Sequence, residues 1–102
     1  MDDAQAGVRA AQADAHATYQ ARWDAATPGE QKVILAMAEV MRASGEQVAR
    51  RTDVADQLGV SSGALSALRE RLIGKAVIEE AGRGLLRFAM PGFAEFVQSL
   101  DG

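Results

Sequence analysis

The sequence predicts a mainly helical domain with a small β-hairpin, and three observations lead to this fold class. Residues 52–74 hold two short stretches with helical spacing of apolar residues, joined by the tight turn Gly59-Val60-Ser61. Residues 76–90 then alternate like two strands around Gly82-Arg83-Gly84. Helical patterns also precede and follow this region. Two helices with such a turn are typical of a helix-turn-helix. With the hairpin they predict a winged helix-turn-helix: a three-helix core, an N-terminal helical arm and a short C-terminal helix.

Residues 1–26 are rich in alanine, which favours helix, and we expect them to form an arm beside a winged helix-turn-helix domain at residues 27–102. The apolar stripe of the arm is thin over residues 1–15, where we expect a frayed start. It strengthens at Tyr19 and Trp23, so the C-terminal half of the arm is expected to dock. Base stacking is an alternative role for these two aromatic residues, but their helical spacing favours packing.

The first core helix has the clearest boundaries. Thr27 is the expected N-cap, Pro28 stands at the first helical position, and Glu30 completes a capping box. The helix is predicted to run to about Ser44 and to end at Gly45. Its expected inward residues are Val33, Ile34, Met37, Val40 and Met41.

The first helix of the helix-turn-helix follows a short extended segment around Val48. Thr52 is the expected N-cap of this helix, and Gly59 is expected to end it in the left-handed conformation. Arg50 and Arg51 lie just before the cap. They suit phosphate contacts and a solvated pair about equally well, and the sequence leaves both interpretations open.

The second helix of the motif is expected to begin at Ser61 or Ser62. Leu65, Leu68 and Leu72 then recur on its inward face. The residues expected on its outer face and flanks are Gly63, Ser66, Ala67, Arg69, Glu70 and Arg71. After the hairpin, Phe93, Phe96, Val97 and Leu100 have the spacing of a last amphipathic helix that closes the core.

Composition excludes several function classes. The chain has 102 residues and no cysteine, so we expect one small domain without a disulfide or a thiolate metal site. A solvent-exposed role is favoured for the lone His16 over metal binding. No apolar run has the length of a membrane helix, and the N-terminus lacks a secretory pattern, so we expect a cytoplasmic protein without a membrane partner. No nucleotide-binding glycine motif or catalytic side-chain set occurs, so we expect no enzyme activity, cofactor or metal.

The charge is unevenly distributed along the chain, whose net charge is −3. Residues 1–49 carry four basic and seven acidic side chains, and residues 88–102 carry two acidic ones. Residues 50–87, the proposed helix-turn-helix and hairpin, carry seven basic and five acidic side chains. A basic patch on an acidic body can still bind phosphate, with marked salt dependence.

These features predict a module that binds double-stranded DNA mainly through phosphates, with modest sequence preference. The candidate DNA-binding residues are Arg50, Arg51, Ser61, Ser62, Ser66, Arg69, Arg83 and Arg87. Arg83 is favoured for groove or backbone contact because it stands at the hairpin tip between two glycines. The alternative is a protein–protein or dimerisation module with the same fold, favoured by the acidic first half and by the exposed-looking Ile73 and Leu85.

A family resemblance rests on four segments: WDAATP at 23–28, RTDVADQLGV at 51–60, RERLIGKAVI at 69–78 and MPGF at 90–93. Together, over roughly residues 19–100, they resemble the C-terminal winged-helix domain of archaeal-type AAA ATPases, the origin-recognition and Cdc-six-like initiators, with relatives in bacteria. The resemblance implies a module that follows an ATPase, contributes to DNA contact and acts in transcription or replication. It also implies an ATPase domain or a second copy as a partner. The ATPase motifs are absent, which suits an excised domain or a stand-alone remnant.

Overall fold

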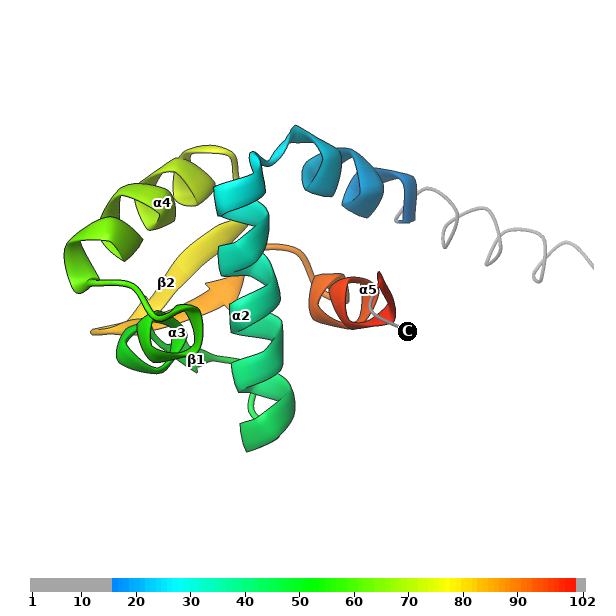
Figure 1. Ribbon diagram of the computed structural model, residues 1–102. Helices are drawn as coiled ribbons and strands as arrows, with labels where there is room; N and C mark the ends of the chain where they lie inside the picture. Colours follow the sequence, from blue (N-terminus) through cyan, green and yellow to red (C-terminus); the bar gives the residue numbers. More distant parts are fainter. Residues whose placement is uncertain (1–15, 101–102) are drawn as a thin grey trace, which may run out of the picture.

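A computed structural model describes residues 16–100, and this part of the chain is mainly helical with a small antiparallel sheet (Figure 1). The elements in order are a helical segment over residues 16–25, α2 (Pro28–Ser44), β1 (Ala49–Arg50), α3 (Arg51–Leu58), α4 (Ser62–Gly74), β2 (Ile78–Gly82), β3 (Leu85–Phe88) and α5 (Phe93–Leu100). The expected frayed start of the arm lies outside the described residues. Among the helices described, none has the length and apolar character needed to cross a membrane.

The predicted capping box at the start of α2 is confirmed. The Thr27 hydroxyl accepts from the Glu30 N–H at 3.2 Å, and Glu30 Oε1 accepts from the Thr27 N–H at 3.2 Å. Pro28 occupies the first turn, and Gly45 ends the helix with φ +74°. These local signals suffice to predict both ends of α2, because the residues involved satisfy backbone groups that a helix end leaves unpaired.

The predicted N-cap of α3 is wrong. The helix begins at Arg51 and not after Thr52, and its N-cap residue is Arg50, whose side chain makes no capping hydrogen bond. The reason is tertiary: Arg50 is paired with Leu85 in β1, and the Arg51 N–H donates to the Gly84 carbonyl at 2.9 Å. Strand β1 therefore runs directly into the helix. The short strand expected around Val48 forms one residue later, at Ala49–Arg50.

The turn between α3 and α4 follows the prediction. Gly59 has φ +68° and closes α3. Ser61 is the N-cap of α4, and its hydroxyl accepts from the Ala64 N–H at 3.2 Å. The two helices are therefore joined by a very short connection.

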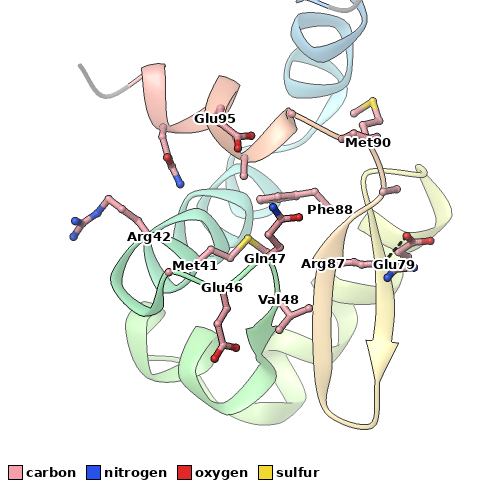
Figure 2. Close-up of a pocket in the computed structure, with 16 residues that line it drawn as sticks. Met41, Arg42, Glu46, Gln47, Val48, Glu79, Arg87, Phe88, Met90 and Glu95 are labelled. Carbon is pink, nitrogen blue, oxygen red and sulfur yellow. Dashed lines mark hydrogen bonds and ion pairs between the residues drawn. The ribbon is translucent and has the colours of Figure 1, made fainter.

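The three strands have the order β1-β3-β2 and are antiparallel. Leu86 of β3 points into the core, while Arg87 points outward beside Glu79 of β2, its partner in the register (Figure 2). Glu80 is turned to the opposite face, toward α4. The predicted hairpin is confirmed, with Gly82-Arg83-Gly84 at its turn.

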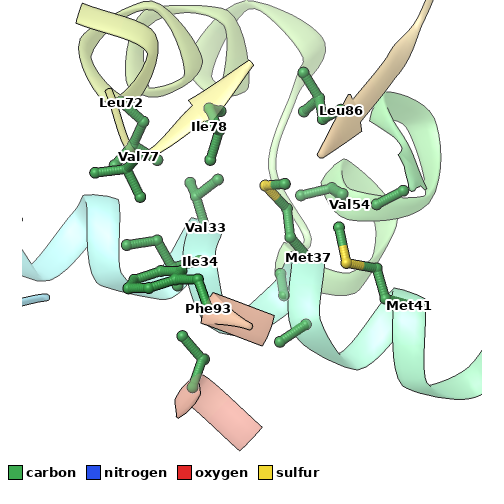
Figure 3. Packing of buried hydrophobic residues seen from close by; sticks show 14 of the residues in the cluster. Val33, Ile34, Met37, Met41, Val54, Leu72, Val77, Ile78, Leu86 and Phe93 are labelled. Atoms are coloured by element: carbon green, nitrogen blue, oxygen red, sulfur yellow. The ribbon is translucent and has the colours of Figure 1, made fainter. Parts of the chain in front are cut away.

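The core is built around α2, whose Val33, Ile34 and Met37 are fully buried (Figure 3). The buried cluster around it is completed by Ala49, Val54, Leu65, Leu72, Val77, Ile78, Leu86, Phe93 and Val97. The predicted closure by α5 is confirmed for its first turns. The placement of Leu100 is wrong, because this residue ends the helix beyond the core and is 42% exposed.

The helical segment of residues 16–25 packs on α5, as the spacing of its aromatic residues predicts. The Tyr19 ring lies 5.7 Å from that of Phe93 and 5.6 Å from that of Phe96, and its hydroxyl donates to the Pro91 carbonyl. The imidazole of His16, an exposed residue, meets Phe96 edge-on at 5.1 Å. The packing role of Tyr19 is therefore confirmed, and Trp23 also packs against the core.

Candidate nucleic-acid interface

Three of the predicted arginines gather at one end of the sheet, which we call the hairpin tip: Arg50, Arg51 and Arg83. Strand pairing sets Arg50 opposite Leu85, and the Arg51 backbone is bonded to Gly84, the residue next to Arg83. Arg50 and Arg83 are exposed and Arg51 is half-buried. In the described part of the chain, none of the three forms an ion pair with a carboxylate. The tip is therefore an uncompensated cluster of positive charge.

The first turn of α4 offers donors of another kind. Its leading N–H groups, at Ser62 and Gly63, have no acceptor within a helix and point outward from its N-terminus. The Ser61 oxygen caps the helix, and the Ser66 hydroxyl donates to the Ser62 carbonyl at 2.9 Å. The hydroxyl groups of Ser61 and Ser66 are thus used within α4, whereas Ser62 is exposed and its hydroxyl makes neither of these bonds.

Arg69 is engaged inside the domain. Its Nη1 donates to Glu80 Oε1 at 2.9 Å, and its side chain is only 14% exposed. Its Nε is buried without a partner among the described residues. This geometry gives Arg69 a structural role, since it holds α4 against β2.

Arg87 is also paired. Its Nε donates to Glu79 Oε1 at 2.7 Å across the β2–β3 ladder. Both side chains are about half exposed on the outer face of the sheet, away from α4. Of the five arginines predicted to contact DNA, three therefore share the tip, and two are neutralised by neighbouring glutamates.

The hairpin tip and the first turn of α4 lie at the same end of the molecule. Helix α4 and strand β2 meet at the corner formed by residues 75–77, and the bond between Arg69 and Glu80 holds them side by side beyond it. Figure 1 shows both running away from that corner to the same side. The hairpin tip and the N-terminus of α4 are therefore on the same side of the domain, away from the corner at residues 75–77.

A buried ion pair that the sequence pattern did not predict fixes the C-terminal end of α4. Lys75 Nζ lies 2.6 Å from Glu30 Oε1 and donates also to the Ala25 carbonyl at 3.0 Å. Glu30 is only 1% exposed, and its hydrogen bond from Lys75 lowers the pKa of the carboxyl. Glu30 was predicted as a capping residue, and no local signal links it to a lysine 45 positions away.

Comparison with known proteins gives one match, over residues 16–97, to the family described as "Domain of unknown function (DUF8462)". The chain belongs to this family. No curated protein and no solved structure matches the chain. The matched range includes the hairpin tip, α4 and the segment that packs on α5, so all three are parts of the family's domain.

Proposed function

We propose that this domain is a winged helix-turn-helix module that binds double-stranded DNA, mainly through its phosphates. In this proposal α3 and α4 are the helix-turn-helix and the β2–β3 hairpin is the wing. The observation that carries the proposal is the cluster of unpaired arginines at the hairpin tip, next to the N-terminus of α4. Guanidinium groups form charge-assisted hydrogen bonds with phosphate oxygens. The free N–H groups of a helix N-terminus favour the same ligand.

The outer face of α4 supports phosphate contact more than base readout. Its exposed residues include Gly63, Ala64 and Ala67, which are small and let the helix approach a groove closely. Base edges are read mainly by Arg, Lys, Asn and Gln. On α4, Arg69 is paired with Glu80, and the exposed Arg71 stands in the last turn, away from the helix N-terminus. Glu70, which is exposed, would repel phosphates. Sequence preference is therefore modest in this proposal.

A narrower proposal concerns the origin of the domain. Four of its segments resemble the C-terminal winged-helix domain of archaeal-type AAA ATPases. This resemblance supports a module that works with an ATPase of the origin-recognition type. It equally supports a small cytoplasmic regulator derived from such an ATPase. The order of elements in the described chain, two helices joined by a short connection and then a hairpin and a last helix, is compatible with this proposal.

Salt dependence tests the DNA proposal. Fluorescence anisotropy with a labelled duplex of random sequence should detect binding in about 50 mM salt. Three arginine–phosphate contacts predict a slope of log affinity against log salt of about −2.7. Raising the salt from about 50 to about 200 mM should therefore weaken binding about 40-fold. Absence of binding at the lower salt concentration would refute the proposal.

A matched pair of charge reversals localises the contact. Arg83→Glu at the tip should weaken binding on the order of tenfold and flatten the salt slope by about one. Arg22→Glu makes the same change at an exposed arginine of the helical segment of residues 16–25, at the other end of the molecule (Figure 1). It should change affinity less than about twofold, because contacts beyond about 10 Å are screened. Equal effects of both reversals would rule out the tip as the binding surface.

A second candidate function, docking of a protein partner or dimerisation, is favoured by one observation. Val60 is 38% exposed just before α4, and Ile73 is 36% exposed near its end, so apolar side chains flank the outer face of this helix. Sedimentation analysis distinguishes this candidate. Self-association that Ile73→Asp removes, together with absence of DNA binding at low salt, would support it in place of DNA binding.

A further inference from the structure

A groove of about 650 Å³ lies at the edge of the sheet and is lined by no residue of α4. It is bounded by the C-terminal end of α2, the link before β1, the hairpin and α5 (Figure 2). Its largest apolar lining residues are Met41, Val48, Phe88 and Met90. Of these, Met41 is buried and the other three are partly exposed, so the groove presents apolar surface to solvent.

The guanidinium groups on the groove wall are neutralised within the domain. Arg42 binds Glu39 through two hydrogen bonds, with Nε 2.9 Å from Oε2. Arg87 binds Glu79 at 2.7 Å, as described above. The wall therefore offers little free positive charge to a ligand.

Two carboxylates at the groove are left uncompensated. Glu46 stands on the link before β1 and Glu95 on the first turn of α5, and both are exposed. Within residues 16–100, neither of them forms an ion pair. The groove thus combines an apolar lining with two negative charges from opposite walls.

We propose that this groove binds a short peptide segment of a partner protein, with basic side chains on either side of a large apolar residue. The apolar side chain would cover Phe88 and Met90, and the flanking Lys or Arg side chains would reach Glu46 and Glu95. Charge complementarity selects this chemistry over an acidic or neutral segment. Burial of apolar surface supplies most of the affinity, while exposed charge pairs contribute less.

The groove is separate from the proposed DNA surface. Leu86 and Ile78 face the core and Glu80 faces α4, whereas Arg87 and Glu79 face the groove. Phe88, the register partner of Ile78, lines the groove at the edge of the sheet, and no residue of α4 lines it, so the two surfaces can be occupied at once. Failure of DNA binding leaves the peptide proposal intact, and the reverse also holds.

The test uses immobilised synthetic peptides that carry one Leu between two Lys at varied spacings, probed with the whole protein. The best peptide is then fluorescein-labelled and titrated by anisotropy. Glu46→Lys with Glu95→Lys should weaken its binding on the order of tenfold, from the loss of two exposed pairs and the added repulsion. Versions with Lys→Glu or Leu→Ser in the peptide should also lose binding.

Glu70→Lys is the matched control variant, because Glu70 is an exposed carboxylate on α4, away from the groove. It should leave peptide affinity unchanged within about twofold. The proposal is overturned if no Leu/Lys peptide binds, if the Glu70 variant loses as much as the groove variant, or if glutamate peptides bind equally well. It is also overturned if the groove variants change the sedimentation of the protein itself, since the occupant would then be a second copy.

Discussion

Replacing Lys75 by Met tests the buried ion pair that joins α4 to the start of α2. The substitution keeps the length of the side chain but removes the ammonium that lies 2.6 Å from Glu30 Oε1. Glu30 stays buried, with its Oε1 still accepting from the Thr27 N–H at 3.2 Å and with its Oε2 unpaired among the described residues. The result is a buried carboxylate that lacks a counter-charge.

The structure sets the expected size of the effect. Removing one partner of a buried pair costs about 3–5 kcal/mol. Lys75 is 37% exposed, so solvent screens the pair, and we expect the lower limit, about 3 kcal/mol. Glu30→Gln keeps an acceptor for both Thr27 and Lys75 and leaves an ammonium that water can reach, so it should cost only about 1 kcal/mol. For a domain of this size, Lys75→Met should lower Tm by at least about 12 °C.

The loss of unfolding free energy caused by Lys75→Met should depend on pH. In the native protein, Lys75 lowers the pKa of Glu30, so the resulting stabilisation is complete above the unfolded pKa and is lost as pH falls through the lower folded value. In the Lys75→Met protein, burial without the ammonium should raise the pKa of Glu30 above its unfolded value. The carboxyl then costs stability as pH rises. The gap between the two proteins should be full near pH 7 and should shrink as pH falls below the ordinary range of a glutamate pKa.

Urea unfolding followed by circular dichroism, at several pH values, measures these free energies. Lys32→Met is the control, because Lys32 is exposed on the same helix as Glu30 and its loss removes the same charge. It should change the free energy of unfolding by less than about 0.5 kcal/mol. The reasoning is refuted if Lys75→Met costs no more than Glu30→Gln, or if the gap to the native protein does not depend on pH.

Two further predictions concern the backbone and the DNA surface. Ala76 has φ +60° at the end of α4, so Ala76→Gly should raise the free energy of unfolding by about 0.5 kcal/mol, measured by urea denaturation; a loss would show that the left-handed conformation costs alanine little here. Glu80→Gln should release Arg69 and strengthen DNA binding about two- to fivefold in the anisotropy assay. Unchanged affinity would mean that Arg69 cannot reach the ligand.

Helix ends were predictable where the signal is local. The capping box of Thr27 and Glu30, the left-handed Gly59 and the serine cap at Ser61 depend on groups within four residues of one another. The start of α3 was not predictable in this way. Pairing with β3, far along the chain, holds Arg50 in a strand, and this contact overrides the preference of Thr52 for a cap.

The candidate site was predictable in its residues but not in their partners. The glycines around Arg83 indicated a hairpin tip, and the charge distribution indicated the basic region. The neutralisation of Arg87 depends on the strand register that sets it beside Glu79. The neutralisation of Arg69 by Glu80 depends on how α4 lies over β2. Neither placement follows from spacing along the chain, so the five arginines could not be divided into paired and unpaired groups.

This division of the arginines is itself an argument about function. Arg69 and Arg87 have carboxylates placed beside them, so the fold uses their charge internally. At the hairpin tip, the backbone brings together the segments that carry three arginines, and even Asp53, two residues beyond Arg51, makes no ion pair with them in the part of the chain described. Like charges on one surface repel one another, and a bound polyanion relieves such repulsion. In the proposed complex, a phosphate backbone at the tip would supply the counter-charge that these three arginines lack among the described residues.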